Sequence, residues 1–324
     1  MGTNRNVYKY VPIIITMVYH EVRKLKGKLY NYLIYNIRDG KKWKKASRYI
    51  GEGAFPKSTI KKEIEKFKIE LKKAEYLSKE QVLEIENIRK KFDSYLRKSG
   101  KIGVEKFDEW FFTELTYNSN AIEGNTLSLE DTSLIINENI APKGASLREI
   151  YEAKNHKEAI EFLKGYKGEL NERLILKIHS FILKNIADSF AGKYRRTEVR
   201  IRGTEFKPPY ADAVPLLVTG LVKWYKENKK KLHPLELAAA VSAKLVTIHP
   251  FIDGNGRVSR LVMNFLLKKA KYPELNIYVK ERDRYLNCIK EANRENYKLL
   301  ALFLFDTLKK NYSFLDKRET QQNL

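Results

Sequence analysis

The sequence predicts a mainly α-helical fold preceded by a small, basic β module. After residue 56, apolar residues recur at helical spacing over most of the chain, whereas the first 55 residues hold short β-prone runs rich in tyrosine. A chain of 324 residues also exceeds what one hydrophobic core usually holds. We therefore expect four parts: a basic β module (1–55), a helical hairpin or linker (56–103), a large helical domain (104–312) and a polar tail (313–324).

The β module is expected to be a three-stranded meander. Its β-prone runs are Val11–Tyr19, Leu29–Tyr35 and Trp43–Gly51, and Asp39-Gly40 between the last two is a hairpin signal. Residues 1–50 carry twelve Lys or Arg against two acidic residues, within a chain of net charge +23. Basic strands with aromatics could bind nucleic acid through phosphates and stacking. A lysine-rich solvated face is the alternative, and the sequence alone favours it.

The helical pattern covers ten segments: Ser58–Leu77, Ser78–Ser99, Val104–Tyr117, Ser146–Leu163, Asn171–Ile186, Ala213–Lys229, Leu235–Ile248, Val258–Ala270, Arg282–Asn293 and 295–311. Ser78 and Ser146 each begin a capping box. No run approaches the ~20 apolar residues needed to span a bilayer, so we expect no membrane association. Cys288 is the only cysteine, which excludes an internal disulfide and favours a cytoplasmic location.

The segment from His249 to Arg257, HPFIDGNGR, lies between two of these helices. Pro250 disfavours helical geometry at His249, so the first helix should end there. Gly254 and Gly256 allow a tight turn at the start of the next helix, where unpaired N–H groups and the helix dipole bind phosphate readily. The sequence therefore predicts a phosphate-binding loop.

The polar side chains of this loop suit phosphate chemistry. His249, with an ordinary pKa near ~6.5, can accept a proton from a hydroxyl group. Asp253 suits a Mg²⁺ ion that bridges phosphate oxygens, and Arg257 can form a paired contact with them. A core histidine beside an ordinary turn would explain any one of these residues but not their ordered combination.

HPFIDGNGR followed by Val258-Ser259-Arg260 matches HxFx[DE]GNGRxxR, and the chain from about Val104 to Leu308 resembles the Fic (filamentation induced by cAMP) family. The resemblance implies a Fic-type helical bundle with a β-hairpin flap. It also implies transfer of AMP from ATP to a hydroxyl group of a target protein, with Mg²⁺ or Mn²⁺ as cofactor. The roles it implies are general base for His249, metal ligand for Asp253, anion hole for Gly254, Asn255 and Gly256, β-phosphate ligand for Arg257 and γ-phosphate ligand for Arg260.

A second motif, Ser119 to Asn125, resembles the family's inhibitory sequence [ST]xxxE[GN]. Ser119 and Glu123 share one face of a helix's last turn. A carboxylate near a helix C-terminus is unfavourable with the dipole, so Glu123 should have a cationic partner. The resemblance implies that this partner is Arg260, which then cannot hold the γ-phosphate. Glu123 could also orient a water molecule that removes AMP from a modified target.

Two further segments correspond to parts of a Fic active site. Alternation of apolar and charged residues predicts a short strand or hairpin, the family's flap, over Thr197, Glu198, Val199, Arg200 and Ile201. An extended flap can align a target segment by strand addition.

In the helix from Arg282 to Asn293, three residues share one stripe: Tyr285, Ile289 and Asn293. The resemblance implies that they bind adenine, although core packing explains Tyr285 and Ile289 equally well. Leu286 stands where the family commonly has an aromatic residue.

The sequence thus predicts a self-inhibited protein adenylyltransferase that modifies a Ser, Thr or Tyr hydroxyl of a target, and of itself, with release of pyrophosphate. A homodimer is plausible because relatives often pair. Two alternatives remain open: a nucleic-acid-binding regulator that uses residues 1–55, and a Fic relative that transfers a different phosphate-containing group.

Overall fold

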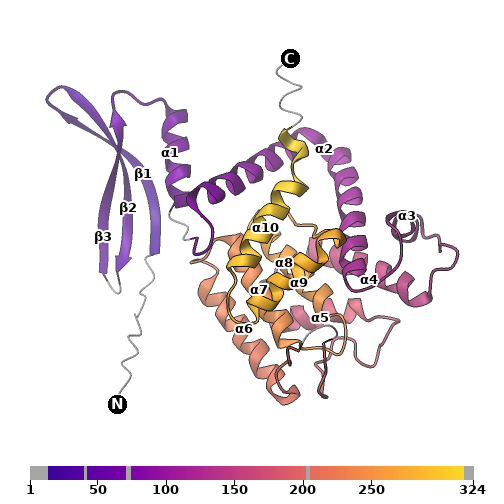
Figure 1. Cartoon of the computed structure of the whole chain (residues 1–324). Coiled ribbons are helices and arrows are strands. Elements are labelled where there is room, and N and C mark those ends of the chain that lie inside the picture. Colours follow the sequence, from indigo (N-terminus) through magenta and orange to yellow (C-terminus); the bar gives the residue numbers. More distant parts are fainter. Residues whose placement is uncertain (1–13, 40–41, 71–73, 202–204, 317–324) are drawn as a thin grey trace, which may run out of the picture. The chain divides into compact units, whose positions relative to one another are not determined.

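The computed structural model describes residues 14–39, 42–70, 74–201 and 205–316. It is mostly helical with one three-stranded sheet near the N-terminus, which confirms the predicted fold class (Figure 1). The described residues fall into two compact units that divide between residues 73 and 74. The predicted hairpin segment, 56–103, is split by this division, and the boundaries at 55, 103 and 312 remain predictions.

The first unit contains the sheet and one helix. Its elements are β1 (Ile14–Leu25), β2 (Lys28–Asp39), β3 (Lys42–Glu52) and α1 (Lys57–Glu70). The strands are antiparallel in the order β1-β2-β3, as the predicted meander requires. Lys26 and Gly27 join β1 to β2 with positive φ angles of 50° and 80°, which suits a two-residue hairpin turn. Residue 40 of the predicted Asp39-Gly40 turn lies outside the described residues, and so do residues 11–13 of the first run.

The core of this unit lies between the sheet and α1. Leu33 is fully buried, and the ring of Tyr35 lies 4.8 Å from that of Phe67 on α1. At the end of the sheet, the side-chain oxygen of Asn31 accepts a hydrogen bond from Nε2 of His20 (2.8 Å), and its side-chain nitrogen donates to the carbonyl of Gly53 (2.8 Å). These contacts use one face of β2, and on its other face Ile34 is also fully buried.

The second unit contains the remaining helices. They are α2 (Lys79–Ile122), α3 (Leu129–Ser133), α4 (Leu147–Gly165), α5 (Glu172–Ile182), α6 (Val214–Asn228), α7 (Pro234–Ile248), α8 (Asn255–Lys269), α9 (Arg282–Ala292) and α10 (Lys298–Asn311), with a π-helical turn η1 (Leu134–Glu138) and two 3₁₀ turns, η2 (Ala211–Ala213) and η3 (Val279–Glu281). The capping boxes predicted at Ser78 and Ser146 are both formed. Among the described residues, no helix combines the length and apolar composition needed to cross a membrane.

Several of the predicted helix boundaries were wrong, including that of Asn171–Ile186, since α5 ends at Ile182. The segments Ser78–Ser99 and Val104–Tyr117 are parts of α2, which continues to Ile122 and is interrupted only by non-helical geometry at Gly100 (φ 63°, ψ −177°). The segment predicted to end at Leu77 is not helical from residue 74, because the N–H groups of residues 75, 76 and 77 all donate to the buried carboxylate of Glu236, at 2.8–2.9 Å. A sequence pattern cannot reveal such a distant acceptor.

The centre of the second unit is the pair α7 and α8 (Figure 1). α7 is buried on nearly all sides, and its small residues Ala238, Ala239 and Ala240 let neighbouring helices approach closely. Most of α8 is also buried. The loop from His249 to Gly254 joins these two helices, so the motif is held between two deeply buried elements of the unit.

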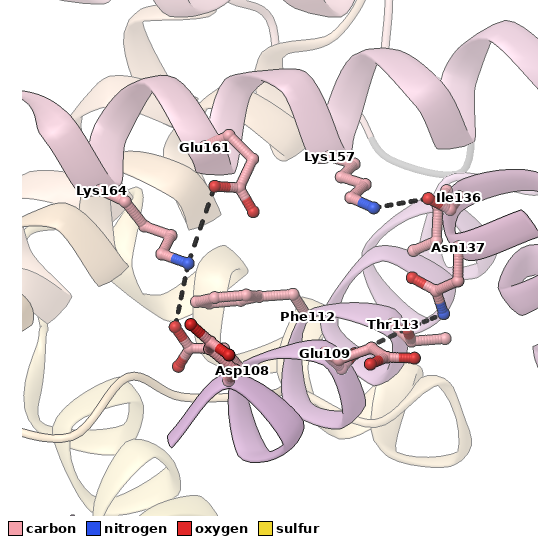
Figure 2. Close-up of a pocket in the computed structure, with 10 residues that line it drawn as sticks. Asp108, Glu109, Phe112, Thr113, Ile136, Asn137, Lys157, Glu161 and Lys164 are labelled. Carbon is pink, nitrogen blue, oxygen red and sulfur yellow. Dashed lines mark hydrogen bonds and ion pairs between the residues drawn. The ribbon is translucent and has the colours of Figure 1, made fainter. Parts of the chain in front are cut away.

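The end of α2 that carries Ser119 and Glu123 is anchored to α4 and η1. Figure 2 shows the pocket between these elements, about 170 Å³ in volume. The Lys164 ammonium group lies 2.9 Å from the carboxylate of Asp108 on α2, and the Lys157 ammonium group donates to the carbonyl of Ile136 in η1. Asn137 donates to the hydroxyl of Thr113 at 3.0 Å. These contacts fix α2 against its neighbours.

Candidate active site

Gly254 takes the turn geometry predicted for the motif loop, whereas Gly256 lies in the first turn of α8 without a positive φ. His249 ends α7 with a positive φ of 50°, and its N–H donates to the carbonyl of Leu245 at 3.1 Å. Gly254 precedes α8 with φ 79°, and a Cβ atom there would lie 2.9 Å from Cγ2 of Ile182. Position 254 therefore requires glycine for both its conformation and its surroundings.

Asn255 closes the loop rather than facing a ligand. Its side-chain oxygen accepts from the N–H of Phe251 (3.0 Å), and its side-chain nitrogen donates to the carbonyl of the same residue (2.9 Å). The side chain is buried. The anion-binding capacity at this point thus belongs to the backbone N–H groups of the first turn of α8, which have no acceptor within their own helix.

His249 is held as a neutral base. Its Nδ1 atom lies 3.3 Å from the carbonyl of Val246, and because a carbonyl only accepts, we assign the proton to Nδ1 and the lone pair to Nε2. Burial lowers the pKa of His249, and the charge of Arg195 adds to this effect. The Val246 contact and the charge of Glu123 offset part of it. A neutral imidazole with an available Nε2 can accept a proton.

The carboxylate of Asp253 lies between two arginines. Its Oδ1 accepts from the N–H of Gly254 (2.6 Å) and from Arg257 (3.2 Å), and its Oδ2 accepts from Arg148 of α4 (2.6 Å). Burial alone would raise the pKa of Asp253, but the charge of Arg257, the Gly254 hydrogen bond and the charge of Arg148 lower it. Asp253 is therefore an anion with two cationic neighbours.

Glu152, which the sequence did not single out, joins the loop to the inhibitory motif. Its Oε1 atom lies 3.1 Å from Arg257 and 3.2 Å from Arg148, and its Oε2 accepts from the side chain of Asn125 at 2.9 Å. Arg257 is almost fully buried, and its Nε has no hydrogen-bond partner within the described part of the chain. Glu152 thus fixes the guanidinium group of Arg257 from α4.

Glu123 and Ser119 both contact Arg260. Oε1 of Glu123 lies 2.8 Å from Nη1 of Arg260. Arg260 also donates to the hydroxyl (3.0 Å) and to the carbonyl (2.7 Å) of Ser119. A Cβ atom at Gly256 would lie 2.1 Å from Oε1 of Glu123, so this carboxylate sits directly against the start of α8. The carboxylate thus lies where a different anion could otherwise contact the N-terminus of α8.

A pocket adjoins His249 and this ion pair. Its lining residues are Glu123, Ile201, Phe206, Val246, His249, Gly256, Arg260, Tyr285, Leu286, Ile289, Lys290 and Asn293. The three residues of the predicted adenine stripe on α9 are therefore together at this pocket. Asn293 uses its side-chain oxygen to accept from the hydroxyl of Thr247 at 2.6 Å. The sequence reasoning missed Phe206, whose only signal is an aromatic residue shortly before Pro208-Pro209.

The β-hairpin predicted for the flap is not formed by the described residues, because residues 195–201 and 205–209 are irregular. Pro208 and Pro209 lack the N–H groups that a strand ladder needs. The buried guanidinium group of Arg195 takes the place of the ladder, since it donates to the carbonyls of Thr197 (3.2 Å) and Pro209 (2.5 Å). Glu198 accepts from the N–H of Ala211 at 2.9 Å, and Ile201 faces the pocket.

Arg195 and His179 also hold the motif loop itself. Nε of Arg195 donates to the carbonyl of His249 at 2.8 Å. The ring of His179 stacks on Phe251 with centroids 3.6 Å apart, its Nδ1 accepts from the N–H of Gly192 (3.0 Å), and its Nε2 lies 3.2 Å from the carbonyl of Asp253. The buried ring of His179 therefore supports the loop.

Residues 169–267 match the Fic/DOC family model. The chain is 35% identical over 198 residues to the protein adenylyltransferase Fic of Drosophila grimshawi and 34% identical to that of Drosophila melanogaster, over 60% of its own length in each case. It spans about two fifths of the length of these curated relatives, 41% and 40%.

Two solved structures share the fold. A Fic-domain-containing signalling protein from Bacteroides thetaiotaomicron is 28% identical with a TM-score of 0.65, over 71% of this chain and 94% of that protein. Fic-1 from C. elegans is 26% identical with the same TM-score, over 75% of this chain and 72% of the other.

Because His179 is buried beneath the motif loop, we expect the stability of the folded protein to fall at acidic pH. Burial lowers the pKa of His179 to about 4, against ~6.5 for an unfolded histidine. Below pH ~6.5 the unfolded chain gains a proton that the folded chain excludes, so this histidine should cost about 2 kcal/mol of stability between pH 7 and pH 5. Urea unfolding at both pH values measures the effect. His179→Gln should make the loss smaller by about that amount, and an unchanged loss would contradict the assignment.

Proposed function

From the premise that this chain carries a Fic domain, we propose that it is a protein adenylyltransferase that moves AMP from ATP to a Ser, Thr or Tyr hydroxyl of a target protein. The observation that carries the proposal is the joint position of His249, the N-terminus of α8 and the α9 stripe around one pocket. This arrangement supplies a base, an anion site and an apolar wall beside each other. The named adenylyltransferase relatives support the same reaction.

In the proposed reaction the target hydroxyl attacks the α-phosphorus of ATP. A new bond forms between the hydroxyl oxygen and phosphorus, the bond from phosphorus to the pyrophosphate oxygen breaks, and Nε2 of His249 takes the hydroxyl proton. Backbone N–H groups at the start of α8 stabilise the negative charge on the phosphoryl oxygens. Arg257, held by Glu152, and Arg260 would contact the outer phosphates once Arg260 is released from Glu123.

Asp253 is the residue that would hold Mg²⁺ or Mn²⁺. Among the described residues, no group of three or more His, Cys, Asp or Glu side chains could hold a metal ion by itself. This suits Mg²⁺, which usually binds through one or two carboxylates together with substrate phosphates. A bound ion would neutralise phosphate charge. Both carboxylate oxygens accept from arginines, so the exposed Arg148 side chain would have to move away first.

We also propose that the described state is the inhibited one. Glu123 lies against the start of α8 and pairs with Arg260. It therefore fills the anion position and also engages the arginine that would bind a phosphate. The same carboxylate could orient a water molecule for removal of AMP from a modified target. Self-modification, a homodimer and a cytoplasmic location, which suits the free and buried Cys288, are parts of this proposal.

The first test follows label from ATP. Glu123→Gly should raise incorporation from α-phosphate-labelled ATP by about tenfold or more, because Arg260 and the start of α8 become available to the nucleotide. His249→Ala should abolish incorporation in either background, because no base accepts the hydroxyl proton. Autoradiography and mass spectrometry of the protein incubated with ATP and Mg²⁺ give the measurement.

Glu138→Gly, which removes an exposed acidic side chain at the end of η1, is the matched control and should leave incorporation unchanged. Label that enters only from the γ-phosphate would reject adenylylation and indicate transfer of a different phosphate-containing group.

Phe206 adds an aromatic side chain to the pocket from the flap region, beside Tyr285 of α9. The sequence places Leu286 at the position where relatives commonly have an aromatic residue, and Leu286 and Phe206 line the same pocket. A purine ring between them would stack on Phe206 rather than on position 286. We therefore assign purine stacking to Phe206.

Phe206→Ala should lower kcat/KM for ATP by roughly 5- to 150-fold, the equivalent of about 1–3 kcal/mol for one stacked base. Initial rates in the Glu123→Gly background measure the loss. Phe206→Tyr keeps a ring and should retain activity, and Phe190→Ala, at an exposed phenylalanine, serves as the control. Equal activity of Phe206→Ala and Phe206→Tyr would remove Phe206 from the nucleotide site.

Arg148 is expected to compete with the metal ion for Asp253. Arg148→Ala should strengthen binding of Mg²⁺–ATP by about two- to fivefold, a modest effect because the pair is solvent-exposed. Isothermal titration of the Glu123→Gly protein measures it without catalysis. Arg284→Ala is a close control, since Arg284 and Asp306 form a pair of the same length, 2.6 Å, and similar exposure. A weaker or equal affinity in Arg148→Ala would contradict the competition.

A further inference from the structure

One face of the N-terminal sheet carries tyrosines that neither the core nor the proposed reaction uses. We call it the tyrosine face: Tyr19 of β1, Tyr30 and Tyr32 of β2, and Tyr49 of β3. Tyr30 and Tyr32 lie on the same side of β2 because side chains alternate along a strand. Tyr49 pairs directly with Tyr32, and Tyr19 pairs with Ile34, so the register brings all four rings to one side.

The helix of this unit covers the opposite face. Leu33 and Tyr35 are on the other side of β2, where Tyr35 contacts Phe67 of α1 and Arg48 lies over the same ring at 5.1 Å. Figure 1 shows α1 beside the sheet. On the tyrosine face, Tyr19 is 37% exposed and Tyr49 is 50% exposed. The rings of Tyr30 and Tyr32 lie 6.2 and 5.5 Å from that of Tyr49, so they form a continuous aromatic surface.

Cationic groups adjoin this surface. The guanidinium group of Arg23 lies 4.4 Å from the centre of the Tyr32 ring, and the ammonium group of Lys45 lies 5.8 Å from that of Tyr19. Glu21 pairs with both cations, at 2.8 and 3.5 Å. The side chains of Arg23 and Lys45 are 48% and 58% exposed, so both cations remain open to a ligand.

The whole segment is positively charged. Residues 1–73 contain nineteen Lys or Arg against six Asp or Glu, a net charge of +13 from the chain's +23. A solvated lysine face would account for this charge. It does not account for four tyrosines gathered on the side of the sheet away from α1, where they add nothing to the core beneath that helix.

We propose that the tyrosine face binds single-stranded nucleic acid. A single strand offers the two chemistries that this face matches: unpaired bases that stack on tyrosine rings, and phosphates that contact Arg23 and Lys45. A duplex keeps its bases stacked on each other and would use only these cations. An acidic peptide offers charge without flat rings. This binding site is separate from the reaction centre and does not depend on the proposed adenylyl transfer.

The test measures fluorescence anisotropy of a labelled oligo(dT) of about 20 nucleotides with the full-length chain, together with a duplex of equal length. The single strand should bind more tightly than the duplex, and His249→Ala should bind equally well. Tyr49→Leu should weaken binding by about tenfold with an unchanged salt dependence, because it removes a stacking surface and no charge. Tyr49→Phe keeps the ring and should bind like the parent protein.

The salt dependence tests the cations of the face. Arg23→Gln combined with Lys45→Gln should lower the slope of log affinity against log salt by about 1.4, which is two phosphate contacts at roughly 0.7 each for a single strand. Lys79→Gln combined with Lys98→Gln removes the same charge from exposed positions on α2 and should leave the slope unchanged.

Three outcomes would overturn the proposal. They are no binding at about 100 µM protein in low salt, equal or tighter binding of the duplex, and equal binding by Tyr49→Leu and Tyr49→Phe. Thermal unfolding shows whether Tyr49→Leu remains folded. If it does not, Tyr19→Leu against Tyr19→Phe on β1 gives the same comparison at a second ring of the face.

Discussion

Arg260 is a buried guanidinium group, with only 3% of its side chain exposed, and a charge removed from water requires hydrogen-bonding partners. Ser119 and Glu123 at the end of α2 supply them. This ion pair joins the longest helix to the start of α8 and brings a carboxylate against Gly256. Glu123 and Arg260 also line the pocket beside His249, so this contact shapes that pocket, while Lys164 and Asp108 hold α2 from α4.

The loop that carries His249 is held in place mostly by side chains that lie outside the loop. Asn255 ties the loop to itself through Phe251, whereas Arg195, His179 and Glu152 hold it from other elements. Each of these side chains is buried, so their positions are set by packing. A site whose donors and base are already in place needs little reorganisation when a charged ligand arrives.

The sequence predicts those features that depend on neighbouring residues. Capping boxes, the stop before Pro250 and the positive φ at Gly254 are local, and the pairing of Glu123 with Arg260 was accessible only through a family motif. Contacts between distant segments were missed, among them the three N–H groups that bind Glu236. The flap shows the limit most clearly, because its alternating pattern favours a strand while two prolines and Arg195 determine an irregular conformation.

The same contacts indicate how the proposed inhibition would be released. α2 is held to α4 through Lys164 and Asp108, and Asn125 is held by Glu152, so a shift of the whole helix would break several interactions together. Glu123 itself is 38% exposed, and Arg260 would keep its two hydrogen bonds to Ser119 if the carboxylate left. Rotation of the Glu123 side chain into solvent therefore costs less than movement of α2. Release by such a rotation would leave Arg260 positioned to meet a phosphate, because Ser119 continues to orient it.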